Sequence, residues 1–316
     1  MVFKPGTFLG NNPARYAERV LAELGATVPP TDERAVAEYR RVKLREFSTR
    51  TLEPELAEAL GEACAWLRWG GDGECSVFVN KDMARARQRL ATYHEFGHLL
   101  LPWHRDLNYL DDERDLDPTT RQPFEREAFR CGAEFLMPRR LFLEDVLSTE
   151  TGVAAIEQLR GRYGASMEAT AIHYAYTHPG SVAVLVVGPP DRKPVPQGKR
   201  SPKYQLSLPI ARPPAQLALD FGPAHPLVVR YSVRSRRFPL GIPSGTGIAE
   251  DSRIFSMWRG RRRAEAEVTA GDFVRVRGRG QAVAECIPLG REGKMLLLLR
   301  KPDRQTRLEF VEGMVL

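Results

Sequence analysis

Residues 81–100, KDMARARQRLATYHEFGHLL, carry two histidines four positions apart, His94 and His98, and a carboxylate, Glu95, directly after the first. The stretch contains no proline, and Asp82 near its start is a candidate N-cap, so the sequence predicts a helix. Residues four apart share one face of a helix, which allows the two imidazoles to bind one metal ion. Glu95 would then lie beside the ion as a general base that takes a proton from water and delivers it to a leaving amine. A chance H-E-x-x-H on an amphipathic surface is the alternative.

A catalytic zinc site needs a third protein ligand, and three residues downstream are candidates: His104, Glu125 and Glu127. His104 completes the metzincin spacing H-E-x-x-H-x-x-x-x-x-H. Metzincins turn sharply at a glycine between these histidines, however, and Leu101 occupies that place here. We therefore interpret His104 as a loop histidine and a bystander to the site.

The two glutamates differ in their positions on the next predicted helix, residues 124–136. At ~100° per residue, Glu125 falls within the broad apolar face of this helix, whereas Glu127 falls opposite, on a face that we interpret as solvated. The other residues on that polar face are Arg126, Arg130 and Glu134. A carboxylate among core residues is costly unless it is paired or bound to a cation. The pattern therefore favours Glu125 over the other candidates as the third ligand.

The sequence around these residues resembles the ImmA/IrrE family of metallopeptidases. The family combines H-E-x-x-H with a loop and the pattern E-x-x-A-N-x-F-A-A-x-L-L-M-P, which HEFGH and EREAFRCGAEFLMP follow in order. Residues 77–80, VFVN, lie directly before the predicted helix 81–100 and also match the strand and asparagine that precede the family's motif. The chain departs from the pattern at Phe129, where the family commonly has asparagine, and at Cys131 and Gly132, which replace a bulkier apolar pair.

The resemblance implies a zincin-like peptidase and carries the family's metal ligands to His94, His98 and Glu125 and its catalytic base to Glu95. Zn²⁺ is the expected ion, and Mn²⁺ or another divalent ion also suits two imidazoles and a carboxylate. The IrrE branch of the family has a C-terminal GAF-like domain and cuts a helix-turn-helix (XRE-type) repressor, which derepresses DNA-damage or stress-response genes. The resemblance implies the same protein substrate and the same reaction here.

The chain as a whole predicts an α+β fold of four parts. Residues 1–147 are the mainly helical, zincin-like peptidase domain with a small sheet, and residues 148–188 are a helix-turn-helix-like segment around a GAS turn. Residues 189–224 form a proline-rich linker. Residues 225–316 form a β-rich domain, which suits the GAF-like sensor that the resemblance implies.

Hydrophobic periodicity and turn residues predict the individual elements. The predicted helical stretches are 13–25, 52–71, 81–100, 124–136 and 139–147, with two further helices in 152–176. A loop is expected at 105–123. The predicted strands are 74–80, 181–187, 227–234, 272–278, 281–288, 294–300 and 307–312.

The net charge of +7 and the pI near 9.4 admit a second function, that of a DNA-binding transcriptional regulator without proteolytic activity. Twelve arginines lie between Arg230 and Arg279, enough to bind phosphates if they share a face. Arginines spread over turns and strand edges would carry no such function. Direct DNA binding is thus a weaker expectation than a protein substrate.

The N-terminal residues, the lack of long apolar runs and the cysteines indicate where in the cell the protein is expected. Residues 1–20 lack the basic, apolar and small-residue regions of a signal peptide, and no run of eighteen apolar residues occurs. We therefore expect a cytoplasmic protein without a membrane partner. The four cysteines form no C-x-x-C pair, and we expect free thiols.

Overall fold

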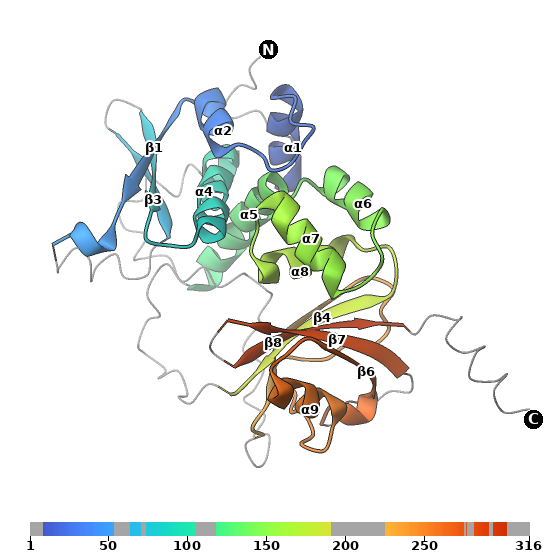
Figure 1. The fold of residues 1–316 in the computed structure, drawn as a ribbon. Helices are drawn as coiled ribbons and strands as arrows, with labels where there is room; N and C mark the ends of the chain where they lie inside the picture. The colour runs from blue at the N-terminus through green and yellow to red at the C-terminus, as the bar shows by residue number, and fades with distance from the viewer. Residues whose placement is uncertain are drawn as a thin grey trace, which may run out of the picture. The chain divides into compact units, whose positions relative to one another are not determined.

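The computed structural model describes residues 9–53, 64–70, 74–104, 118–190, 225–274, 276, 281–290 and 293–301. They divide into two compact units. The first contains the described parts of Met1–Phe142 and Leu159–Ser166, and the second those of Leu143–Gln158, Met167–Pro196 and Ile210–Leu316. The predicted α+β class is confirmed: the described residues form eight α-helices, a three-stranded sheet and a five-stranded antiparallel sheet (Figure 1).

The first unit contains the small sheet, with strand order β1-β3-β2. Its strands are β1 (Val42–Phe47), β2 (Ala65–Trp69) and β3 (Cys75–Asn80). Strand β3 was predicted, whereas the helix predicted over 52–71 is wrong for Ala65–Trp69, and residues 54–63 of that stretch lie outside the described residues. The indole of Trp66 stacks on Phe78 of β3 at 4.9 Å and contacts Phe47 of β1 at 4.4 Å. Cross-strand aromatic pairs of this kind stabilise a strand whatever the local helical pattern.

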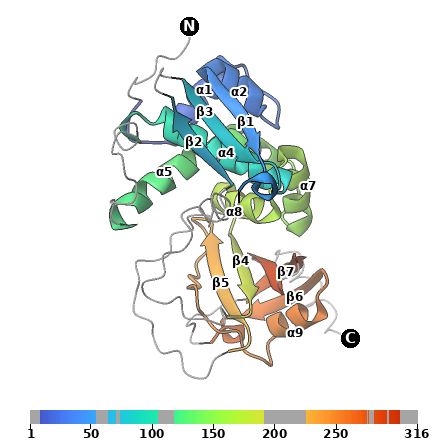
Figure 2. The same cartoon turned by 90° about the vertical axis from the view of Figure 1, so that its left-hand side faces the viewer.

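Helix α4 (Arg85–Leu100) is central to the first unit and is mostly buried. It packs against α1 (Ala14–Glu23), α2 (Glu33–Arg40), α5 (Pro118–Leu136) and, on another side, against β2 and β3 of the sheet (Figure 2). The predicted helix is confirmed, but its predicted N-cap is not. Ala84 occupies the N-cap position, and the carboxylate of Asp82 instead accepts hydrogen bonds from Ser48 at 2.7 Å and Thr49 at 3.3 Å. Asp82 thus anchors the chain after β1 rather than the start of the helix.

Helix α5 begins earlier than predicted. The loop expected over 105–123 is wrong for its last six residues, because the helix starts at Pro118 and runs through Pro123. Proline is well tolerated at the first helical position, where its fixed φ is already helical. Residues 105–117 lie outside the described residues.

The second unit is built on the antiparallel sheet β5-β4-β8-β7-β6. Its strands are β4 (Val182–Gly188), β5 (Val228–Arg234), β6 (Ala264–Thr269), β7 (Gln281–Leu289) and β8 (Lys294–Arg300). Strand β4 is buried at every position because both of its faces are covered. Ala183, Leu185 and Val187 belong to the core that also contains residues of α9 (Arg253–Gly260), while α8 (Met167–Thr177) also contacts this strand.

Three short helices complete the described chain, and all were predicted. Helix α6 spans Arg139–Leu147, and α7 (Val153–Tyr163) is separated from α8 by a tight turn. Gly164 begins this turn with φ of +59°, a left-handed conformation that glycine adopts without strain.

Predictions for the C-terminal sheet were partly right. Strands β4, β5, β7 and β8 were predicted, whereas α9 and β6 were missed. The strand predicted over 272–278 is wrong where it is described: Ala270–Asp272 form a 3₁₀ turn and Phe273 makes one isolated bridge to Ile248. The strand predicted over 307–312 and nearly all of the 189–224 linker lie outside the described residues.

The structure also bears on membrane insertion and on the thiols. Among the described residues, no helix has both the length and the apolar character that a membrane crossing requires. None of the four cysteines, all of which are described, forms a disulfide, as the lack of a paired motif predicted, and all four are buried.

Candidate metal centre

The site is built where α4 and α5 cross with their backbones in contact. A Cβ atom added to Gly97 of α4 would lie 2.3 Å from the carbonyl oxygen of Ala128. One added to Gly132 of α5 would lie 2.8 Å from the backbone nitrogen of His94. Only glycine fits at such separations, so these two residues allow the close crossing that brings the side chains of the two helices together.

Three predicted ligands converge at this crossing. The Nε2 atom of His94 lies 3.1 Å from Glu125 Oε2 and 3.1 Å from His98 Nε2, and His98 Nε2 lies 3.7 Å from Glu125 Oε2. The three atoms all lie within 4.8 Å of one another and form a group that could hold a metal ion. His94 is buried, and the other two side chains are partly exposed. Solvent or a substrate would therefore reach a metal ion bound here from the side of His98 and Glu125.

The donor set fits a divalent cation. Ligand atoms about 2.0–2.1 Å from a tetrahedral zinc ion are about 3.3 Å apart, close to the three separations observed. Burial alone would raise the pKa of Glu125, but the hydrogen bonds and charge of His94 and His98 outweigh it and hold this pKa well below its usual value. The carboxylate is therefore charged, as a metal ligand must be. The buried Nδ1 atom of His94 has no hydrogen-bond partner within the described chain, so that imidazole is directed at the site through Nε2 alone.

Glu95 lies on α4 directly after His94 and is partly exposed. Its neighbours on the helix, His94 and Phe96, are buried. Glu95, the residue predicted to be the catalytic base, thus provides a carboxylate that is accessible to solvent next to the group of three ligands.

His104 and Glu127 lie outside the group of three ligands, but both are more buried and make more contacts than the sequence predicted. His104 is not a bystander: its side chain is fully buried, its Nδ1 lies 3.0 Å from Nδ1 of His98, and its Nε2 lies 3.2 Å from Oε2 of Glu127. Glu127 is partly buried rather than simply solvated, and it also accepts a hydrogen bond of 2.6 Å from Trp103 Nε1. His104 is nevertheless absent from the group of three converging ligands, in agreement with the argument against metzincin geometry.

A local turn explains this arrangement. After α4, Leu101 has an extended backbone (φ −77°, ψ 114°), and Pro102–His104 form a 3₁₀ turn that directs His104 inward. Burial lowers the pKa of His104 to about 4, as does the nearby His98, and Glu127 only partly opposes this. His104 is therefore neutral near pH 7. The signal in the sequence was the pair Trp103 and His104, two residues with ring N–H groups directly after an apolar run.

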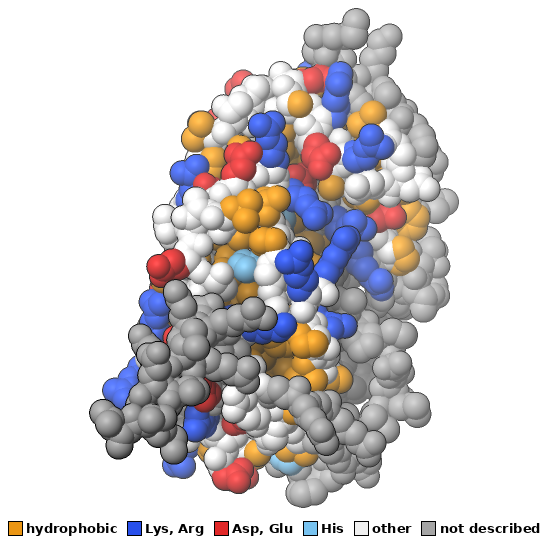
Figure 3. Space-filling model, turned by 90° about the vertical axis from the view of Figure 1, so that its right-hand side faces the viewer, with side chains coloured by type: hydrophobic (Ala, Val, Ile, Leu, Met, Phe, Trp, Pro, Cys, Tyr) orange, Lys and Arg blue, Asp and Glu red, His pale blue; other side chains and the backbone are white. Residues whose placement is uncertain are grey.

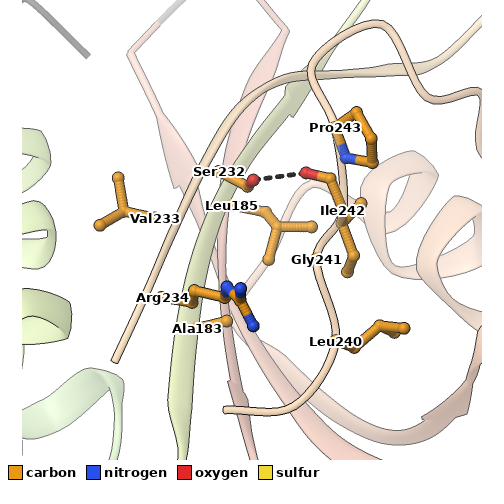
Figure 4. A pocket seen from close by; sticks show the side chains of 9 residues that line it. All are labelled: Ala183, Leu185, Ser232, Val233, Arg234, Leu240, Gly241, Ile242 and Pro243. Atoms are coloured by element: carbon orange, nitrogen blue, oxygen red, sulfur yellow. Dashed lines mark hydrogen bonds between the residues drawn. The ribbon is translucent and has the colours of Figure 1, made fainter. Parts of the chain in front are cut away.

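The second unit contains a separate cavity of about 280 Å³ between β4, β5 and the segment 240–243 (Figure 4). Its polar side chains are already engaged: Ser232 donates to the carbonyl oxygen of Ile242, and Arg234 donates to that of Phe238 at 2.8 Å. These bonds hold the wall of the cavity in place. The cavity therefore lacks the converging polar groups that define a reactive site.

Some arginines of the second unit are engaged in contacts within the chain, and others are exposed. On the face drawn in Figure 3, several Lys and Arg side chains lie side by side near the middle, and others lie among acidic, apolar and uncharged ones. Arg230 and Arg253 donate to backbone carbonyl oxygens, and Arg263 forms an ion pair of 3.1 Å with Glu157. The exposed arginines around the end of α9 are Arg259, Arg261, Arg262 and Arg263.

Comparison with known proteins agrees with this site. The solved structure of a Mycobacterium tuberculosis transcriptional regulator superposes with a TM-score of 0.53 at 13% sequence identity, covering 97% of this chain and 81% of that one. At this identity the similarity shows a shared fold alone. No curated protein matches the chain. Residues 70–173 match the model of the IrrE N-terminal-like domain, peptidase family M78. The segment that carries His94, Glu95, His98 and Glu125 is thus an IrrE N-terminal-like domain.

Proposed function

We propose that this protein is a metal-dependent endopeptidase that cleaves a helix-turn-helix (XRE-type) transcriptional repressor and so derepresses DNA-damage or stress-response genes in the cytoplasm. The observation that carries the proposal is the convergence of His94, His98 and Glu125 beside Glu95. The match of residues 70–173 to a peptidase domain supports a peptide bond as the bond that is cut. The repressor as substrate rests on the resemblance to the IrrE branch.

In this proposal His94, His98 and Glu125 hold Zn²⁺, with Mn²⁺ or another divalent ion as a substitute. A divalent ion in this position supplies Lewis acidity toward water and a substrate carbonyl group. Glu95 takes a proton from the attacking water and delivers it to the amine that leaves. The partial exposure of Glu95, between two buried neighbours, supports its access to a substrate.

The test compares the purified protein with a Glu95→Gln variant, each supplied with zinc or manganese and a candidate repressor. Loss of a general base typically costs about 10²- to 10⁴-fold in rate. We expect the variant to bind the metal like the wild type and to cleave the repressor at least about 100-fold more slowly. Equal cleavage by the two proteins would remove Glu95 as the base.

A DNA-binding regulator without proteolysis is the second candidate. It is favoured by the fold shared with the regulator from Mycobacterium tuberculosis and by the exposed arginines around the end of α9. Against it, most side chains of α8 are buried, including Met167, Ala171 and Tyr174, so the second helix of the helix-turn-helix-like pair has little surface for reading bases. Tight DNA binding with a steep salt dependence, together with no cleavage of any repressor, would favour this candidate.

The role of the second unit is part of the proposal. We infer that its sheet is a GAF-like sensor, as the resemblance implies. Binding of an effector in the cavity beside Arg234 would support this, since that cavity is a concave space of about 280 Å³ within the unit.

A further inference from the structure

A series of polar contacts extends from the candidate metal centre through Nδ1 of His98, the ring nitrogen on the side away from the other two ligands. The Nε2 atom of His98 faces His94 and Glu125, and its other ring nitrogen, Nδ1, lies 3.0 Å from Nδ1 of His104. On the far side of His104, Nε2 lies 3.2 Å from Glu127 Oε2. The same carboxylate oxygen accepts the indole N–H of Trp103 at 2.6 Å. Four side chains thus form one connected series that ends on a predicted ligand.

The contacts match one arrangement of protons when His98 binds a metal ion through Nε2, the atom that faces the other two ligands. The Nδ1 atom of His98 then carries the ring proton and donates it to Nδ1 of His104, 3.0 Å away. Because His104 accepts at Nδ1, its own proton lies on Nε2, which is 3.2 Å from Glu127 Oε2. The series therefore matches the tautomer of His98 that can bind a metal ion.

Packing holds the series in place. The His104 side chain is fully buried, and its ring lies against Phe124 at 5.2 Å and against Trp103 at 6.0 Å. The ring of Trp103 in turn meets Tyr16 of α1 edge-on at 5.6 Å. Rotation of His104 away from His98 would therefore disturb its contacts with Phe124 of α5 and with Trp103, the residue that packs on α1.

We propose that His104 and Glu127, supported by Trp103, are positioning residues that fix the tautomer and the orientation of His98. His94 differs in this respect, because its buried Nδ1 has no partner within the described chain. Outer hydrogen-bond partners of metal-binding histidines typically change metal affinity by about 10- to 100-fold. The inference rests on the proposed function, in that His98 is taken as a ligand of a metal ion.

The experiment measures zinc affinity by competition with a chromophoric chelator, in the full chain. His104→Phe keeps an aromatic ring beside Phe124 but removes both ring nitrogens, and Glu127→Gln removes the charge that selects the tautomer. Glu150→Gln, at an exposed position outside the helices and strands, is the matched control for charge. The ¹⁵N chemical shifts of His98 in each protein report which ring nitrogen carries a proton, a property that a merely structural role would leave unchanged.

We expect zinc affinity to fall about 10- to 100-fold in His104→Phe and Glu127→Gln, with the control unchanged, and the Nδ1–H signal of His98 to be lost or mixed. If His104→Phe fails to fold, Glu127→Gln, whose side chain is one-third exposed, decides alone. Wild-type affinity and unchanged His98 shifts in both variants would overturn the inference. His94→Ala separates the two proposals: zinc binding unaffected by this change would overturn the proposed metal site itself.

Discussion

Two carboxylates of α5 show how much one residue depends on its surroundings. Glu125 was predicted on the apolar face of the helix, and it lies there, opposite two imidazoles. Glu134 was predicted on the solvated face, but it is only 6% exposed, because α1 packs against α5. Its Oε1 atom accepts a hydrogen bond of 2.6 Å from the backbone N–H of Arg139. Burial, as the largest effect, raises the pKa of Glu134 to about 7.

We predict that Glu134 makes the protein less stable as the pH rises. A folded-state pKa near 7 exceeds the unfolded value near 4.5, so the native state holds the proton more tightly between these pH values. Stability is then lost as the pH rises from about 4.5 to 7, by up to about 3 kcal/mol. Glu134→Gln removes this loss while keeping an acceptor for Arg139. Chemical denaturation of both proteins at several pH values measures the difference.

The difference in unfolding free energy between Glu134→Gln and the wild type should increase toward pH 8 in favour of the variant. Glu150→Gln, at an exposed position, provides the control and should show no such trend. A constant difference from pH 4.5 to pH 8 would mean that Glu134 is not held in its protonated form by burial.

At the scale of elements, the crossing of α4 and α5 decides whether a metal site exists at all. Gly97 and Gly132, one on each helix, permit the backbone contact. Gly132 appeared in the sequence as a departure from the family pattern, and the structure gives it a steric reason. Each of these glycines faces backbone atoms of the other helix, which cannot move aside as the end of a flexible side chain can.

We predict that Gly132→Ala separates the helices and weakens metal binding. The added Cβ would lie 2.8 Å from backbone atoms of Tyr93 and His94, so α5 must shift and carry Glu125 with it. Overpacking of this kind typically costs about 1–3 kcal/mol. Gly161→Ala in α7 is the control, since an exposed helix position with nothing within 4 Å should gain about 0.5–1 kcal/mol from alanine. Thermal unfolding and zinc titration of both variants test this, and equal stabilisation by both would contradict it.

Helix α4 is also clamped by one buried arginine. Arg89, on the second turn of the helix, contacts Glu33 Oε1 at 3.0 Å through Nε, donates through Nη1 to Tyr163 O at 2.6 Å and through Nη2 to Thr31 O at 2.8 Å. The side chains of Arg89 and Glu33 are 6% and 9% exposed. The clamp therefore ties the helix of the metal ligands to the start of α2 and to the end of α7.

We predict that Arg89→Met destabilises the protein by about 3–5 kcal/mol, because it leaves the buried Glu33 with the exposed Arg85 in place of its buried partner and removes the hydrogen bonds from Arg89 to the carbonyl oxygens of Tyr163 and Thr31. Arg85→Met is the matched control. Arg85 contacts the same carboxylate at 2.8 Å, but its side chain is 68% exposed, so we expect a loss below about 1 kcal/mol. Urea denaturation measures both, and similar losses would show that burial is not what makes the clamp strong.

At the scale of the whole molecule, the proposed metal ion couples binding to stability. A ligand that binds only the folded state stabilises it by about 2.7 kcal/mol at a concentration 100 times its Kd. The three ligands come from α4 and α5, which contact each other extensively within the first unit. Metal binding should therefore stabilise this unit against opening.

We predict that zinc slows hydrogen exchange of backbone amides in α4 and α5 and that a chelator reverses the effect. The sheet β4 to β8 belongs to the other compact unit and supplies no predicted ligand, so its amides serve as an internal reference. His94→Ala is the control and should show no response to zinc. Protection of α4 by zinc in His94→Ala as well would indicate that the ion binds elsewhere.

The extent of prediction differed between helices and strands for a physical reason. Several helices carry their own periodic pattern, and α4, α6, α7 and α8 were predicted from it. The pattern of residues 65–69 predicted the end of a helix. These residues form a strand because Trp66 packs against Phe47 and Phe78, which belong to two other strands. Strand β6 alternates small and charged residues without an apolar run, and pairing with β7 makes it a strand.

The sequence by itself determined the register of His94, Glu95 and His98 and the face of α5 on which Glu125 lies, because both follow from the repeat of a single helix. Tertiary structure decided what surrounds them. It buried Glu134 beneath α1 and joined His104 to His98 and Glu127. Periodicity describes one element at a time, whereas the environment of a polar side chain depends on which other element covers it.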